Sequence, residues 1–171
     1  ARLLGRDVIV WRGANDLDGH AADPDVGLTG RDALVERRQR WLVATLLLVV
    51  AAALFVHTFS DAIQLADSGE VVAVACNGGV AHPPGFPLHS LLGHLACAIP
   101  WSTPAARVGA VSLVAALGAV LLLFLAVVRL TESTWAALVA GLTLATGAGF
   151  WRHASLAEVF ALHVALSLLV V

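Results

Sequence analysis

Long uncharged segments alternate with short polar ones along this chain of 171 residues. The first, Trp41 to Phe59, would form an α-helix about 28 Å long, close to the roughly 30 Å hydrocarbon core of a bilayer. Val108 to Val128 and Trp135 to Phe150 follow, and a fourth apolar segment begins near Glu158. The pattern predicts an all-α, polytopic membrane protein with about four spans.

The composition agrees with this class. Hydrophobic residues make up 59% of the chain and charged residues only 13%, with a mean hydropathy of +0.87. A soluble domain is less apolar, at about 45–50%. The net charge of -2 and the lack of a long basic run exclude a nucleic-acid-binding protein.

The two ends of the chain differ from its middle. Residues 1–28 are rich in Gly, Asp and Pro and predict an extended arm or linker. Thr29 and Asp32 resemble a capping box, so we expect a helix to begin near Gly30 and a helical membrane domain to occupy residues 29–171. The last residues lie inside an apolar run without a flanking charge, so we expect this domain to be incomplete at its C-terminus.

A polar stretch, Asp67 to Pro87, separates the first two predicted spans. Asp67 and Glu70 are three residues apart, so both carboxylates face the same way if the stretch is helical. Asn77-Gly78-Gly79 should end that helix, and the three prolines that follow His82 form a rigid elbow. Leu88 to Ile99 is too short to span a bilayer and predicts an interfacial or re-entrant helix. We therefore expect an outer loop at the membrane interface that consists of a helix, a proline elbow and a second helix.

The arginine distribution predicts the orientation. Three arginines precede the first span, whereas acidic residues follow it, so the positive-inside rule places the N-terminus in the cytoplasm and the loop of residues 60–105 outside. Arg107, at the outer end of the second span, goes against this rule, which suggests an anionic partner. Five charged residues then lie on the outer side: Asp67, Glu70, Arg107, Arg152 and Glu158.

Several motifs together resemble one family of membrane proteins. DSGE at residues 67–70, HPPGFPLHSLLGHL at 82–95, RVGAVSL at 107–113 and FWRHASLAEVFALH at 150–163 occur in that order. They resemble the N-terminal part of the multi-spanning family that contains the eukaryotic transmembrane protein O-mannosyltransferase, among the lipid-phosphate-sugar-dependent glycosyltransferases of the GT-C architecture. The chain departs from the family pattern at Gly109 and at residues 160–163.

The resemblance implies roles for the outer residues. Asp67 or Glu70 would accept the proton of the acceptor hydroxyl, as an acidic residue of the first outer loop does in GT-C enzymes. Arg107 and Arg152 would hold the leaving lipid phosphate, since a guanidinium binds phosphate through two parallel hydrogen bonds. His82 and Glu158 would complete the substrate site. The implied partners are membrane lipids, a polyprenyl-phosphate sugar and a protein acceptor outside the cytoplasm.

The histidines and cysteines support other interpretations less well. No histidine spacing predicts a closed metal site, and spacing alone does not support a divalent ion between Asp67, Glu70 and a phosphate. We therefore predict no metal ligand and no certain cofactor. His57 and His163 lie in apolar segments and leave pigment or haem ligation open. Two cysteines in apolar surroundings are more often buried small hydrophobes than a disulfide, and we expect unpaired thiols here.

Two functions are consistent with the sequence. The first is a GT-C-like glycosyltransferase segment that moves a sugar, such as mannose, from a polyprenyl-phosphate donor to an extracytoplasmic acceptor. The alternative is a non-catalytic transmembrane scaffold subunit of a large membrane assembly, such as a photosynthetic or respiratory complex. Its partners would then be neighbouring membrane subunits. The length of the intact gene product separates them, because an enzyme of this architecture needs further spans.

Overall fold

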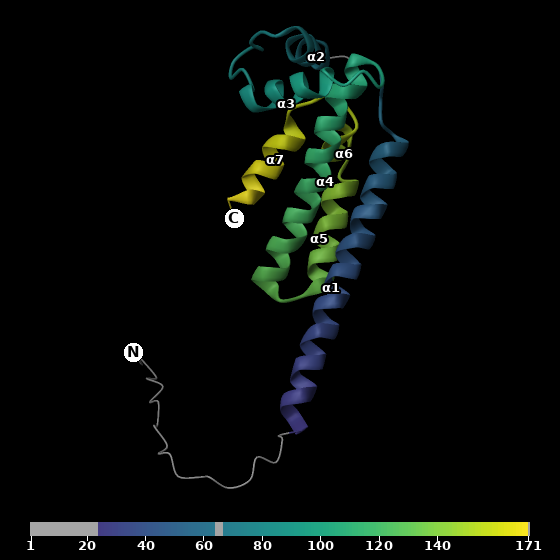
Figure 1. Ribbon diagram of the computed structural model, residues 1–171, viewed down its shortest axis with the longest axis vertical. Helices are drawn as coiled ribbons and strands as arrows, with labels where there is room; N and C mark the ends of the chain where they lie inside the picture. The colour runs from purple at the N-terminus through teal and green to yellow at the C-terminus, as the bar shows by residue number, and fades with distance from the viewer. Residues whose placement is uncertain (1–23, 64–66, 171) are drawn as a thin grey trace, which may run out of the picture. The chain divides into compact units, whose positions relative to one another are not determined.

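The computed structural model describes residues 24–63 and 67–170, apart from the side chains of residues 24–29 and 31. Within these ranges every regular element is an α-helix, which confirms the all-α prediction (Figure 1). The arm predicted for residues 1–28 falls largely outside the described residues. The helices are α1 (Pro24–His57), α2 (Ser68–Asn77), α3 (Pro87–Cys97), α4 (Pro104–Thr131), α5 (Thr134–Thr146), α6 (Ala148–Ala154) and α7 (Phe160–Leu169).

Helix α1 contains the first predicted span. The chain divides into a unit of Ala1–Glu36 and a second unit of Arg37–Val171, and α1 begins in the first and continues into the second. The helix starts at Pro24, ahead of the start predicted near Gly30. Its part from Asp32 to His57 is long and apolar enough to cross a membrane. The polar residues before the apolar segment therefore extend the same helix, because nothing in them breaks it.

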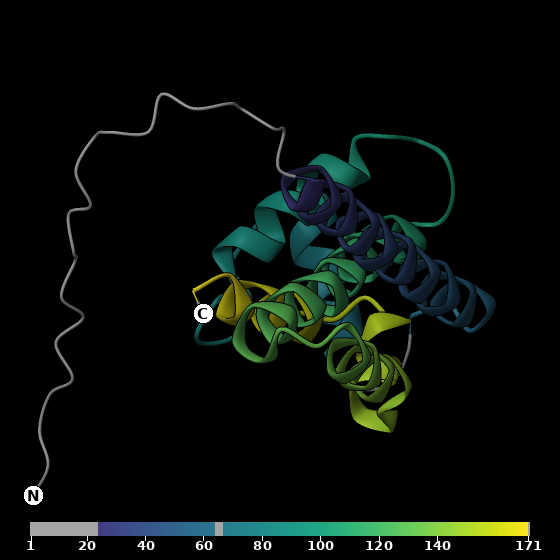
Figure 2. The same ribbon diagram turned by 90° about the horizontal axis from the view of Figure 1, so that it is seen from below.

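Helix α4 is the central helix of the second unit and matches the predicted span of Val108 to Val128. It begins with Pro104, and the Thr103 hydroxyl caps it by accepting a hydrogen bond from the backbone N–H of Ala106 at 3.1 Å. Helices α2, α3, α5, α6 and α7 all contact it. In Figures 1 and 2, α5 and α7 lie along α4, whereas α2 and α3 cover one of its ends. We call α2, α3 and the elbow between them (residues 67–97) the cap.

The third predicted span is not one straight helix. It is divided into α5 and α6, which are bent by 67°. Gly147 leaves the helical conformation at ψ 119°, and its N–H is satisfied by the carbonyl oxygens of Thr143 and Leu144. The span predicted over Trp135 to Phe150 is therefore present only if α5 and α6 together form one broken span, and an uncharged run does not reveal where the hydrogen-bond ladder ends.

The prediction of about four spans is confirmed only in part. Among the described residues, two helices are long and apolar enough to cross a membrane, or three if α5 and α6 form one broken span. Helix α7 has ten residues, whereas a span needs about 20. The structure thus shows an apolar helical protein with fewer complete spans than predicted.

Small and large apolar side chains alternate in the main core. Leu47 and Phe55 of α1 are fully buried with Phe124 of α4. A Cβ atom built at Gly141 of α5 would lie 2.5 Å from Leu47 Cδ2, so this glycine gives α1 close access to α5. A second core joins Val71 and Ala75 of α2 to the N-terminal end of α4. The cap is therefore packed onto the helices by its own hydrophobic cluster.

Candidate functional site

The carboxylates predicted to form the site lie at the start of α2. Asp67 precedes the first residue of the helix and Glu70 lies in its first turn. Val71, Val72 and Ala75 are buried beneath the helix, which leaves both acidic side chains on its exposed face. The helix ends before Gly78, whose φ of 79° is readily adopted by glycine. This confirms the short helix predicted to follow Asp67 and its end at the glycines.

His82 binds Glu70, a contact that the sequence did not reveal. The backbone N–H of His82 donates to Glu70 Oε1 at 2.6 Å, and His82 Nδ1 lies 2.7 Å from Glu70 Oε2. The other ring nitrogen, Nε2, lies 4.0 Å from Asp67 Oδ2. The ring also packs edge-on against Phe86 at a centroid distance of 5.7 Å. The elbow thus returns the chain to the first turn of α2 and places one imidazole beside both carboxylates.

These contacts shift two pKa values. The hydrogen bond from the His82 side chain, followed by that from its backbone, lowers the pKa of Glu70. The hydrogen bond to Glu70 and its negative charge raise the pKa of His82, with a further contribution from Asp67. Asp67 accepts no hydrogen bond through its side chain within the described part of the chain, and the side chain is 62% exposed. Of the two carboxylates, Asp67 is therefore the one still open to a ligand.

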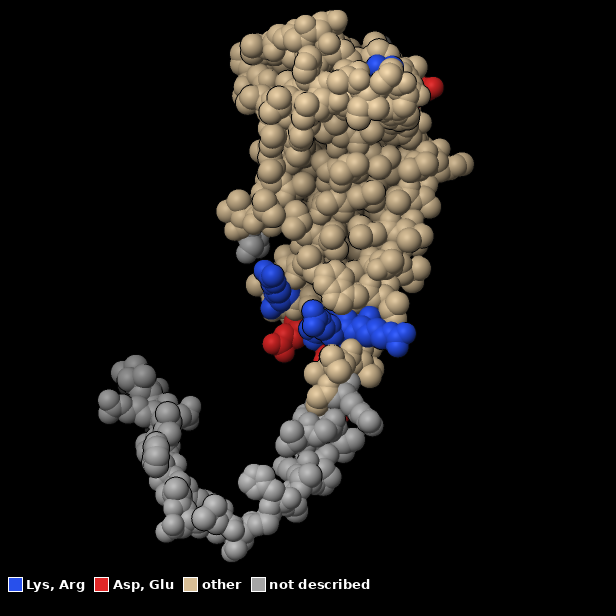
Figure 3. All heavy atoms as spheres, viewed as in Figure 1, with Lys and Arg blue, Asp and Glu red and all other residues tan. Residues whose placement is uncertain are grey.

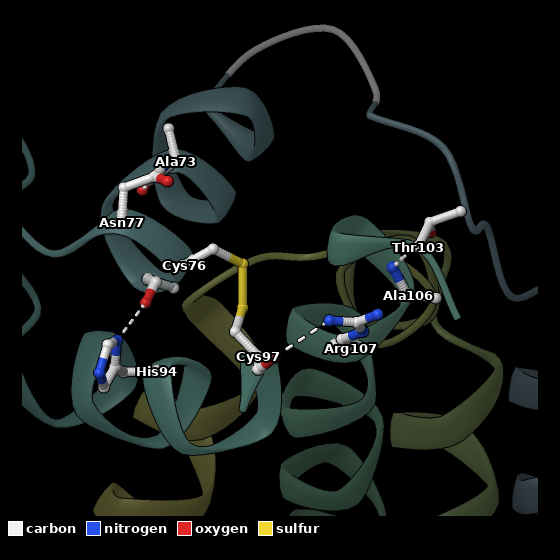
Figure 4. Close-up of a disulfide and its surroundings, with 9 residues drawn as sticks. Ala73, Cys76, Asn77, His94, Cys97, Thr103, Ala106 and Arg107 are labelled. Atoms are coloured by element: carbon white, nitrogen blue, oxygen red, sulfur yellow. Dashed lines mark hydrogen bonds between the residues drawn. A yellow bond between two sulfur atoms is a disulfide. The ribbon is translucent and has the colours of Figure 1, made fainter. Parts of the chain in front are cut away.

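A disulfide between Cys76 and Cys97 ties α2 to α3 (Figure 4). The expectation of unpaired thiols was wrong. The elbow runs back to the first turn of α2, where His82 meets Glu70. Helix α3 then ends beside the last turn of α2, a proximity that a sequence separation of 21 does not show. His94 of α3 adds a second link, since its Nδ1 lies 2.9 Å from the carbonyl oxygen of Ala75. The cap is thus cross-linked near the end opposite Asp67.

Glu158 lies between α6 and α7 and is held from α4. Its backbone N–H donates to Ser112 Oγ at 3.1 Å, and that hydroxyl donates to the Glu158 carbonyl oxygen at 2.7 Å. Burial, with a further contribution from the charge of Asp67, raises the pKa of the Glu158 carboxyl, whereas Arg152 acts in the opposite direction. Asp67 and Arg152 are therefore both within electrostatic reach of Glu158.

Arg152 lines a pocket of about 410 Å³ beside the start of this loop, together with Thr58, Trp151 and Ser155. Trp151 Nε1 donates to Thr58 Oγ1 at 2.8 Å, and the same hydroxyl lies 2.9 Å from Ser155 Oγ. Hydroxyl groups, an indole and an exposed guanidinium are suited to a phosphorylated or polyhydroxylated ligand. Sequence reasoning missed Thr58 and Ser155, because a hydroxyl at the end of an apolar run gives no signal of its own.

Arg107 lies in different surroundings. Its Nη1 donates to the carbonyl oxygen of Cys97 at 3.1 Å (Figure 4), and its side chain lines an apolar groove of about 410 Å³ with Trp101, Val114 and Leu162. No hydrogen bond or ion pair joins it to Asp67, Glu70 or Glu158 in the part of the chain that the structure describes. The structure therefore places His82 beside both Asp67 and Glu70. The charges of Asp67 and Arg152 act on Glu158, whereas Arg107 is bound to α3.

The fold and this site define a class: a helical membrane protein with an acidic, disulfide-linked cap at one end of its apolar helices. Residues 67–171 match the family described as the Protein O-mannosyl-transferase TMEM260 N-terminal domain, and the chain belongs to this family. It is 35% identical over 113 residues to mouse Protein O-mannosyl-transferase TMEM260, a match that covers 66% of this chain and 16% of the mouse protein. The chain thus spans only a small part of that relative's length. No solved structure matches it.

Proposed function

We propose that this chain is part of a GT-C-like glycosyltransferase that moves a sugar, such as mannose, from a polyprenyl-phosphate donor to a hydroxyl of an extracytoplasmic protein acceptor. Membership of the O-mannosyl-transferase family supports the reaction class. The observation that carries the proposal is the exposed Asp67 carboxylate, which lies beside a paired Glu70 and His82. An enzyme of this kind needs one free base among fixed neighbours.

In the proposed reaction, Asp67 is the base. Glu70 uses both carboxylate oxygens on His82, so it positions the elbow and leaves proton transfer to Asp67. The acceptor oxygen forms a bond to the anomeric carbon of the sugar while the bond from that carbon to the phosphate oxygen breaks. The hydroxyl proton passes to Asp67, and the electron pair of the broken bond leaves with the polyprenyl phosphate.

The leaving phosphate needs a cation. We propose Arg152 and Arg107 for this role, and the surroundings of Arg152 support it more directly, since its charge acts on Glu158 beside Asp67. Arg107 borders an apolar groove, which suits the lipid portion of a donor better than its sugar. Glu158 and His82 complete the proposed site.

The disulfide supports an extracytoplasmic cap, because structural disulfides persist in oxidising compartments and are rare in the cytosol. Arginines are present at the ends of the apolar helices that lie away from the cap. They are Arg37, Arg38 and Arg40 in α1 and Arg129 in the last turn of α4. In Figure 3 basic side chains gather at that end, and the face in view between it and the cap shows almost no charge. Both features favour a cytoplasmic N-terminal side and an outer cap.

The test is Asp67→Asn in the full-length protein, assayed with a polyprenyl-phosphate sugar and an acceptor peptide. The amide keeps the shape of the carboxylate but accepts no proton, so turnover should fall on the order of 10²-fold or more. Asp61→Asn is the matched control, because Asp61 is also exposed and, among the described residues, its hydrogen bond is made by its backbone carbonyl, which accepts from the Thr103 hydroxyl. Full transfer by the Asp67 variant would refute the catalytic role and favour the scaffold subunit.

A further inference from the structure

The cap places three metal-binding side chains together. Asp67, Glu70 and His82 each offer one ligand atom, and these atoms all lie within 4.8 Å of one another. The carboxylates come from the first turn of α2, whereas the imidazole comes from the elbow. The sequence spacing predicted only the two acidic residues as neighbours, and the elbow brings His82 to them as a third ligand.

The charge of this cluster favours a cation. Two carboxylates face one imidazole, and Glu158 is close enough to Asp67 for that charge to raise its pKa. When His82 is neutral, Asp67 and Glu70 together carry two negative charges that the imidazole does not balance. Arg152 acts on Glu158 but makes no ion pair with Asp67 or Glu70 in the described ranges. A divalent ion would neutralise this pair of charges.

The geometry needs only small adjustments. A first-row metal with ligand bonds of about 2.0–2.2 Å holds its ligand atoms roughly 3–3.5 Å apart. The three ligand atoms, one from each side chain, lie within 4.8 Å of one another, so the side chains need to draw together only slightly to reach this range. The three side chains are 40–62% exposed, so they can rotate without disturbing the core, and an ion between them would face solvent.

We propose that Asp67, Glu70 and His82 bind a divalent first-row transition-metal ion, of the Mn²⁺ or Zn²⁺ type, with its remaining coordination positions open. The imidazole nitrogen disfavours Mg²⁺, which is bound mainly through oxygen ligands, whereas mixed nitrogen and carboxylate sets suit the transition metals. The ion replaces the proton held by His82, because a metal binds the neutral imidazole. This goes beyond the proposed function, since binding needs neither donor nor acceptor.

The experiment titrates Mn²⁺ into the full-length protein in detergent, with free Mn²⁺ measured by electron paramagnetic resonance and Zn²⁺ and Mg²⁺ as competitors. We expect one bound Mn²⁺, displaced by Zn²⁺ far more readily than by Mg²⁺. Asp67→Asn and His82→Ala should each weaken binding at least tenfold, because each removes one of three protein ligands. Lowering the pH should release the ion, because protons compete with the metal for the His82 nitrogen and the carboxylates. Asp61→Asn and His163→Ala are the controls and should bind as the wild type does.

The outcomes separate metal binding from folding and from catalysis. Non-reducing mass spectrometry for the Cys76–Cys97 bond shows whether His82→Ala still folds, and if it does not, Asp67→Asn decides alone, since its side chain makes no hydrogen bond to lose. Absence of a bound ion, or equal affinity in both site variants and the controls, would overturn the proposal. Sugar transfer by a protein that binds no Mn²⁺ in the titration would refute this site and leave the proposed function intact. A protein that binds the ion but transfers no sugar would refute the proposed function and leave the metal site intact.

Discussion

Gly93 is the point at which the close packing of the cap can be tested most directly. A Cβ atom built at this residue of α3 would lie 2.8 Å from the Cβ of Ala75 in α2 and 3.5 Å from Val108 Cγ1 in α4. Ala75 is fully buried and its side chain has no rotamer by which to move away. Gly93→Ala therefore forces α2 and α3 apart by several tenths of an ångström, against the Cys76–Cys97 disulfide.

The expected cost follows from two opposing effects. Overpacking a close helix contact destabilises a protein by about 1–3 kcal/mol, whereas replacing glycine by alanine within a helix gains about 1 kcal/mol. Gly118→Ala measures the second effect alone, because no atom lies within 4 Å of the Cβ position at Gly118 in α4. The difference in unfolding free energy between the two variants should therefore be about 1–3 kcal/mol, with Gly93→Ala the less stable.

Both variants are compared with the wild type by unfolding of the full-length protein in detergent. The same samples are assayed for sugar transfer, since a displaced α2 carries Asp67 with it. Equal stability of Gly93→Ala and Gly118→Ala would show that α2 and α3 are not in the contact described here. The packing of the cap would then need to be revised.

Two further predictions concern the cap. The pair of Glu70 and His82 should stabilise the cap most between about pH 4.5 and 6.5. The lowered pKa of Glu70 gives stability that is present above its ordinary value of 4.5 and is lost as the pH falls through the lowered pKa. The raised pKa of His82 gives stability that is present below 6.5 and is lost as the pH rises through the raised pKa. Glu70→Gln should flatten the metal-free profile of melting temperature against pH, and a profile identical to that of the wild type would contradict the pair. Replacing both Cys76 and Cys97 by serine opens a loop with a sequence separation of 21 and should cost about 3 kcal/mol; an unchanged unfolding midpoint under non-reducing conditions would show that the bond does not constrain the cap.

The sequence alone determined the elements whose physics is local. Uncharged runs predicted α1 and α4, because a helix in a bilayer must satisfy its own backbone and present apolar side chains. The spacing of Asp67 and Glu70 and the glycines after Asn77 predicted α2, since one turn of helix and one glycine stop need no distant partner. The motifs from DSGE onward also indicated the family to which residues 67–171 belong.

Only the tertiary structure decided which distant residues meet. The elbow brings His82 to Glu70 and Cys76 to Cys97, and the direction in which a chain reverses depends on the packing of Val71 and Ala75 onto α4. The break at Gly147 was hidden for the same kind of reason, since an apolar run has the same hydropathy whether its helix is straight or bent. Hydropathy indicates whether a residue favours an apolar or a polar environment, and the packing of the whole chain decides which residues it contacts.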